Sequence, residues 1–87
     1  MQFTDFETFS VPLKLPLLII KGRHGLLACG YIDSETCNKT GEAIALVSGV
    51  KDFDDMALAT VTKVSTAAAA LGLKPGMRGV EVLEVIR

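Results

Sequence analysis

The sequence predicts one small α+β domain, in which a sheet of about four strands packs against three to four short helices. The strands are indicated by alternating apolar and polar residues at positions 9–15 and by continuous apolar runs at 17–20 and 26–32. Start and stop signals in the second half of the chain indicate the helices. A chain of 87 residues has room for one core, so residues 1–87 form a single domain.

The first predicted strand carries four apolar side chains on one face: Phe9, Val11, Leu13 and Leu15. The two prolines of this segment fall on the opposite face. Because proline cannot donate a hydrogen bond to a neighbouring strand, we expect this strand at a sheet edge or across a subunit interface. The glycine-containing segment Lys21–Gly25 joins the next two apolar runs, which predicts an antiparallel hairpin.

Capping residues predict where the helices begin and end. Asp33 begins the first helix and Gly41 ends it, and a third apolar strand follows at residues 43–47. The connector before that strand is short, so the direction of the strand relative to its neighbour stays open. The carboxylates of residues 52–55 begin a second helix, where the helix dipole favours negative charge.

Thr60 is expected to cap a third helix. Its apolar residues recur at helical spacing: Val61, Val64, Ala68 and Leu71. Gly72 ends this helix, and Pro75 lies just beyond it. The last segment, residues 77–87, suits a strand by propensity and a helix by its apolar stripe; we expect a helix.

Composition excludes several classes of protein. The formal net charge is -1 without any basic run, so we expect no nucleic-acid partner. The apolar runs are too short to span a bilayer, and the first residues do not read as a signal peptide, so no membrane partner is expected. The two cysteines are then most simply reduced thiols in a cytoplasmic protein.

A high apolar content combined with a low aromatic content predicts a homo-oligomer. Apolar residues make up 49% of the chain, but aromatic residues make up only 6%, so aliphatic side chains must build the core. A domain of this size buries roughly 60–65% of the surface that its unfolded chain exposes. We therefore expect a second copy to cover some apolar surface, with Phe9, Val11, Leu13 and Leu15 in the interface.

Three blocks occur in order along the chain: residues 25–33 read GLLACGYID, residues 49–55 read GVKDFDD and residues 71–79 read LGLKPGMRG. Together they resemble the YunC-like family of small bacterial and archaeal domains of unknown function, over roughly residues 13–86. The resemblance implies a compact α/β domain whose N-terminal β region, residues 1–32, mediates self-assembly into a tetramer. It implies no reaction, and it favours a helix for the last segment.

Cys29 is the first candidate for chemistry. A nucleophilic thiol needs a base or a cation beside it. The single histidine, His24, lies five residues upstream, which is about 16 Å along an extended strand, although the histidine of a neighbouring subunit can reach. A packing role is favoured for both Cys29 and Cys37.

No metal or cofactor is expected. The two cysteines and His24 lack the close pairing of zinc ligands, and a helix start explains Asp52, Asp54 and Asp55 without an ion. The segment containing Lys74, Gly76 and Arg78 is the most plausible contact for a small anionic ligand, because it combines two cations with accessible backbone amides. It is not a Walker or dinucleotide motif, and a turn and packing role is the favoured explanation.

Three functions remain in order of preference. The first is a homo-oligomeric, non-catalytic assembly or ligand-binding module. The second is a small enzyme with an intersubunit site that uses Cys29 or His24. The third is an anion or nucleotide sensor that uses Lys74 and Arg78.

Overall fold

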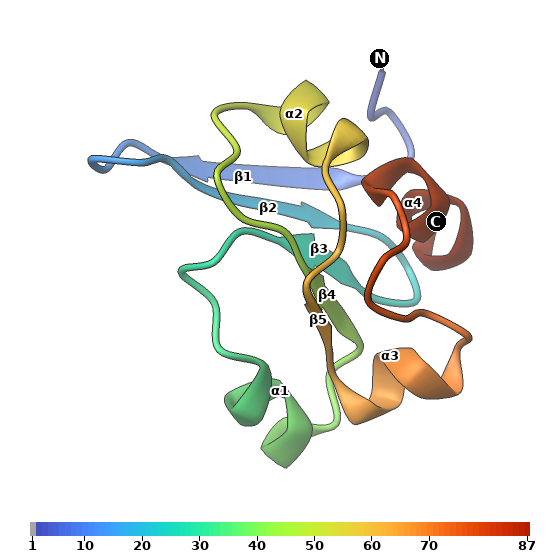
Figure 1. Ribbon diagram of the computed structural model, residues 1–87. Coiled ribbons are helices and arrows are strands. Elements are labelled where there is room, and N and C mark those ends of the chain that lie inside the picture. The colour runs from blue at the N-terminus through green and yellow to red at the C-terminus, as the bar shows by residue number, and fades with distance from the viewer. Residues whose placement is uncertain (1) are drawn as a thin grey trace.

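A mixed five-stranded sheet lies at the centre of the computed structural model, which describes residues 2–87 (Figure 1). In both chain order and sheet order the strands are β1 (Glu7–Val11), β2 (Leu17–Lys21), β3 (Leu26–Ala28), β4 (Ile44–Leu46) and β5 (Lys63–Val64). Strands β3 and β4 are parallel, and the other neighbours are antiparallel. The predicted α+β class is confirmed, with one strand more than the four expected.

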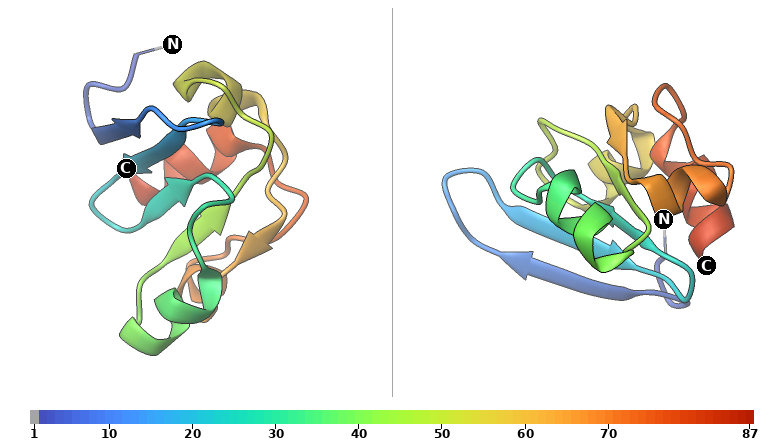
Figure 2. Two further views of the ribbon diagram at one scale, coloured as in Figure 1. Left: turned by 90° about the vertical axis from the view of Figure 1, so that its left-hand side faces the viewer. Right: turned by 90° about the horizontal axis from the view of Figure 1, so that it is seen from below.

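Four short helices cover the two faces of this sheet unequally (Figure 2). They are α1 (Ser34–Thr40), α2 (Phe53–Leu58), α3 (Thr66–Ala70) and α4 (Gly79–Ile86). Helices α2, α3 and α4 contribute side chains to a large core on one face, whereas α1 packs alone against the other face.

The pleat of β2 and β3 sorts their side chains between the two faces. Leu18, Ile20 and Leu27 are buried in the large core, where they meet side chains of α2 and α4. Ala28 points to the opposite face and joins Cys37 of α1 in a second, smaller cluster. The chain therefore builds one thick layer and one thin layer around a single sheet.

Ser65 is fully buried, and its hydroxyl group makes three hydrogen bonds inside the protein. Its hydroxyl donates to the carbonyl of Glu42 at 2.7 Å and accepts from the amide of Ile44 at 3.0 Å, at the entry to β4. It also accepts from the amide of Ala68 at 3.3 Å, which caps α3. One side chain thus positions α3 against the start of β4.

Several predicted boundaries are confirmed. Asp33 caps α1 by accepting from the amide of Glu35 at 3.0 Å, and Gly41 ends that helix in the left-handed region with φ of 80°. Gly72 also has positive φ, as a helix stop requires. The last segment is helical, as its apolar stripe predicts.

Two predicted strands are shorter than expected. The strand expected over residues 9–15 begins earlier and ends at Val11, because the chain bends through residues 12–16 to pair β1 with β2. The strand expected over residues 26–32 ends at Ala28, because a turn closes when the amide of Ile32 donates to the carbonyl of Cys29. In both segments the apolar residues continue beyond the strand into a loop, and sequence periodicity does not separate the two.

The prediction that Thr60 caps the third helix is wrong. Thr60 instead forms an isolated antiparallel bridge with Arg78, and Val64 belongs to β5. The helix begins later, at Thr66, with Ser65 as its cap. Pairing with β4 holds this segment extended, so a tertiary contact overrides the local helical spacing.

Replacement of Ser65 by alanine is expected to lower the free energy of unfolding by about 1–3 kcal/mol, because the buried amide of Ile44 loses its acceptor. Urea denaturation followed by circular dichroism measures the change. The exposed Ser48 provides the control, and Ser48→Ala should change stability by less than about 0.5 kcal/mol. Equal effects of the two substitutions would contradict the role given to Ser65.

Gly79, the first residue of α4, lies directly against α2. A Cβ atom at this position would overlap the carbonyl oxygen of Met56. We expect Gly79→Ala to destabilise the protein by about 1–3 kcal/mol, although alanine is the better helix former by about 1 kcal/mol. In the matched control Gly30→Ala, the nearest atom to the new Cβ is that of Ser48 at 3.9 Å, so the free energy of unfolding should stay within about 1 kcal/mol.

Candidate functional site

The predicted interface residues lie on the N-terminal hairpin. Strand β1 is at one edge of the sheet, as predicted, although Pro12 and Pro16 lie in the connection that follows it, and all five residues of β1 are exposed. Phe9 and Val11 share one face of β1 and are each 45% exposed, while Leu13 and Leu15 lie in the connection to β2 and are 48% and 55% exposed. Figure 1 shows this connection reaching out beyond the helices.

Burial changes steadily along one row of side chains that crosses the sheet. Phe9 pairs with Ile19, Ile19 with Ala28, and Ala28 with Leu46, so the four side chains share a face. Phe9 is exposed, Ile19 is half-buried, and the last two are buried beneath α1. This face is covered over β3 and β4 and open over β1 and β2. We call Phe9, Val11 and Ile19 the hairpin face.

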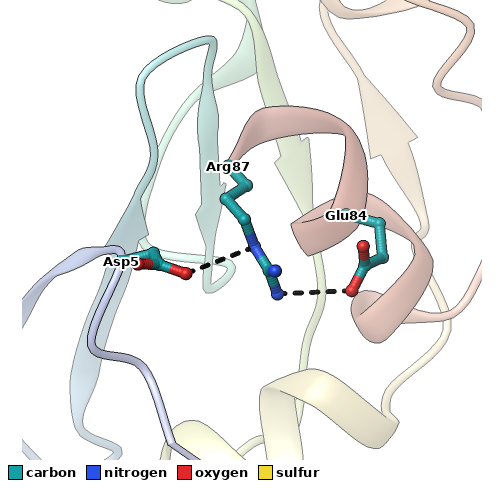
Figure 3. A network of polar contacts seen from close by, with 3 residues as sticks. All are labelled: Asp5, Glu84 and Arg87. Atoms are coloured by element: carbon teal, nitrogen blue, oxygen red, sulfur yellow. Dashed lines mark hydrogen bonds and ion pairs between the residues drawn. The ribbon is translucent and has the colours of Figure 1, made fainter.

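An ionic contact holds the first residues against the end of α4 (Figure 3). The guanidinium of Arg87 lies 3.7 Å from the carboxylate of Asp5 and 3.3 Å from that of Glu84. It also lies over the ring of Phe6, at 5.8 Å from the ring centroid. Because these groups are largely solvent-exposed, each pair contributes only about 0–1 kcal/mol. The contact orders the start of β1 and offers no evident chemistry.

Within one chain, the structure does not bring Cys29 and His24 together. They flank β3 at its opposite ends, and each is engaged locally. Cys29 is 4% exposed, and its sulfur accepts from the amide of Leu18 at 3.3 Å. The backbone amide of His24 donates to the carbonyl of Ile86 at 2.9 Å. An enzymatic site that uses both residues requires a second subunit and stays a prediction.

Cys37 lies under α1 in the smaller cluster. Desolvation by burial raises the pKa of its thiol, and the nearby carboxylates of Glu42 and Asp33 raise it further. A thiol with a raised pKa holds less thiolate at neutral pH, and the thiolate is the reactive form. The environment of Cys37 therefore opposes nucleophilic chemistry.

The predicted anion contact lies in the loop before α4. Its backbone amides already have protein acceptors: that of Gly76 donates to Val61 at 2.9 Å, and that of Arg78 donates to the carboxylate of Glu81 at 2.9 Å. The amide of Lys74 points at the sulfur of Met77. An anion here would therefore depend on the side chains of Lys74 and Arg78, beside a carboxylate. The anion site stays a prediction without support from the backbone.

The acidic cluster of residues 52–55 begins α2 as expected. The carboxylate of Asp52 accepts from the amide of Asp55 at 2.7 Å, and that of Asp55 accepts from the amide of Lys51 at 3.0 Å. These bonds account for both carboxylates as caps. Over residues 2–87, no three side chains of His, Cys, Asp or Glu come together as a metal site would require.

A hollow that the sequence does not reveal opens beside Cys29. Its volume is about 310 Å³. The loops that follow β3 and β4 form its walls, and the β1–β2 connection closes one end. Its lining residues are Leu15, Pro16, Cys29, Gly30, Tyr31, Ser48, Gly49 and Val50. The sequence singles out Cys29, but only the fold places it with Tyr31 and Ser48 around one space.

Comparison with known proteins defines the class to which this fold belongs. The family described as a domain of unknown function (DUF1805) matches residues 28–86, so the chain belongs to that family. It is similar to the uncharacterized protein YunC of Bacillus subtilis (strain 168), with 32% identity over 81 residues that cover 85% of this chain and 80% of the relative. The predicted YunC-like resemblance is confirmed.

A solved structure shares the fold over nearly the whole chain. The protein of unknown function TA1206 from Thermoplasma acidophilum superposes with a TM-score of 0.82 and 33% sequence identity, over 94% of this chain and 93% of that one. The matched region includes the N-terminal hairpin, because the superposition covers 94% of this chain.

Within residues 2–87, every helix is too short or too polar to cross a bilayer.

Because the pKa of Cys37 is raised, its thiol should react slowly in the folded protein. In a Cys29→Ala variant at pH 8, we expect Ellman's reagent to modify Cys37 more slowly in the folded protein than in the same variant unfolded in urea. In the folded protein, the rate of modification should keep rising at pH values above the pKa of an ordinary free thiol. Stopped-flow absorbance between pH 7 and pH 10 measures both. Equal rates in the folded and unfolded chains would show that the thiol is not shielded.

Proposed function

We propose that this chain is a self-assembling, non-catalytic module in which the N-terminal hairpin forms the contact between copies. The observation that carries the proposal is the hairpin face: Phe9 and Val11 are each 45% exposed on an edge strand. An edge strand also presents unpaired backbone groups, which natural proteins usually protect with charges, prolines or a covering element. Here Pro12 follows β1 and Glu7 begins it, but the central residue of the strand, Phe9, is apolar.

A second copy of the same chain suits this surface. In a two-fold interface each residue is used twice, so one exposed phenylalanine and one exposed valine supply four buried side chains. Each side chain is only 45% exposed, so covering the remainder contributes about 0.7–1.4 kcal/mol, or about 3–5 kcal/mol for the four. Association costs about 4–15 kcal/mol, so these residues alone give marginal assembly. Leu13 and Leu15 have to join the interface if the assembly is to be stable.

The proposed assembly is a tetramer in the cytoplasm, in which the two-fold contact through the hairpin forms pairs and a second, different contact joins two pairs. Both cysteines are free and buried, and free thiols favour a reducing compartment. The N-terminal β region proposed to assemble, residues 1–32, contains β1, β2 and β3; its first residue, Met1, lies outside the described residues. The separation of Cys29 from His24 by β3 favours a non-catalytic role over an enzyme built within one subunit.

Replacement of Phe9 by glutamate is expected to dissociate the assembly. The change removes two apolar contacts for each pair of subunits and buries two charges, so the dissociation constant should rise by at least about 100-fold. Size-exclusion chromatography with multi-angle light scattering at micromolar concentration measures the mass. The unmodified chain should give four times its 9.3 kDa, and Phe9→Glu should give a lower multiple or the monomer.

Ser10→Glu is the matched control, because Ser10 is equally exposed on the same strand but points to the other face. It should leave the mass unchanged. A monomeric unmodified chain at these concentrations would refute the proposal. Equal dissociation by both variants would show that the hairpin face is not the contact.

A further inference from the structure

The one parallel pair of the sheet, β3 and β4, sends its two connections to opposite faces. After β3, residues 29–33 lead to α1 on the thinly covered face. After β4, residues 47–52 lead to α2 on the face of the large core. Two chains that separate at the carboxyl ends of neighbouring parallel strands leave a crevice between them. In open sheets such crevices are where small ligands bind.

The hollow beside Cys29 is this crevice. One wall is formed by residues 29–31, which follow β3, and the other by residues 48–50, which follow β4. Its volume of about 310 Å³ corresponds to about ten water molecules at 30 Å³ each. That volume lies at the small end of the range for ligand pockets, so it fits a small molecule rather than a nucleotide.

The lining restricts the charge of the occupant. None of the eight lining residues carries a charged side chain. A charged ligand would lose hydration without meeting an opposite charge, which is unfavourable. Leu15, Pro16 and Val50 supply apolar contacts, while the hydroxyls of Tyr31 and Ser48 offer hydrogen bonds to one polar group.

Part of the lining is held in place by the core. Cys29 is 4% exposed and belongs to the large core, and its sulfur accepts from the amide of Leu18. Val50 is likewise buried in that core. The inner side of the crevice therefore belongs to the packed core of the fold, which limits the ordering that a ligand would have to impose.

Because Gly30 has no side chain, the space between the two walls stays open. A Cβ atom built on it would face the Cβ of Ser48, on the opposite wall, at 3.9 Å, and the backbone of Gly30 does not have a positive φ. A side chain at position 30 would thus extend between the walls without straining the backbone. Gly30 therefore provides a means of closing the crevice while leaving the fold intact.

From these observations we propose that the crevice between the β3–α1 and β4–α2 loops binds a small uncharged molecule with an apolar body and one hydrogen-bonding group. This inference goes beyond self-assembly: it uses neither Phe9 nor Val11 and shares only Leu15 with the proposed interface.

The test compares three probes that share one ring and differ in charge: benzyl alcohol, benzoate and benzylamine at neutral pH. Each is titrated into the full ¹⁵N-labelled chain while amide shifts are followed by NMR. Benzyl alcohol should shift the amides of Gly30, Tyr31, Ser48 and Gly49 in a saturable manner. The two charged probes should bind at least about tenfold more weakly, because their charged groups would lose hydration without meeting an opposite charge in the lining.

Gly30→Leu should abolish the saturable shifts while the rest of the spectrum and the melting temperature remain close to those of the unmodified chain. If that variant does not fold, Tyr31→Ala provides the second test, because Tyr31 is an exposed lining residue whose loss should weaken benzyl alcohol binding at least about fivefold.

Three results would overturn the proposal: no saturable shift at these amides, equal binding of benzoate, or binding that appears only in Phe9→Glu. The last result would mean that a neighbouring subunit fills the crevice. Since subunit mass is measured separately, failure of the ligand site and failure of self-assembly are distinguishable.

Discussion

The unequal covering of one sheet governs this structure. Five strands present two faces that both carry apolar side chains, yet three of the four helices pack on the same face and a single seven-residue helix serves the other. That helix reaches β3 and β4, so the row from Leu46 to Phe9 passes from buried to exposed. Apolar surface left in this way is stabilised by contact with another molecule, and in a chain of this size a second copy is the simplest source.

The same arrangement accounts for the crevice. Ser65 fixes the start of β4 against α3, and the parallel pairing of β3 with β4 aligns the carboxyl ends of both strands. Because the chain leaves one of these strands toward α1 and the other toward α2, the two loops diverge. Apart from Leu15, the proposed interface and the proposed ligand site use different residues.

Conventional signs of catalysis are weak in this fold. The burial that makes Cys29 and Cys37 good packing residues also keeps them from their potential partners, and the pKa of Cys37 is raised. The glycine loop before α4 looks accessible to an anion in sequence, but its amides serve to join α4 to the neighbouring segments.

The sequence by itself determined the fold class, the edge position of β1, the caps at Asp33 and Asp52, and the helical stops at Gly41 and Gly72, because each depends on local backbone preference or on a period within a few residues. Only the tertiary structure decided that residues 63–64 form a strand, that Ser65 replaces Thr60 as the helix cap, and that Cys29, Tyr31 and Ser48 surround one hollow. These features depend on pairing between segments far apart in the chain, which a local pattern does not encode.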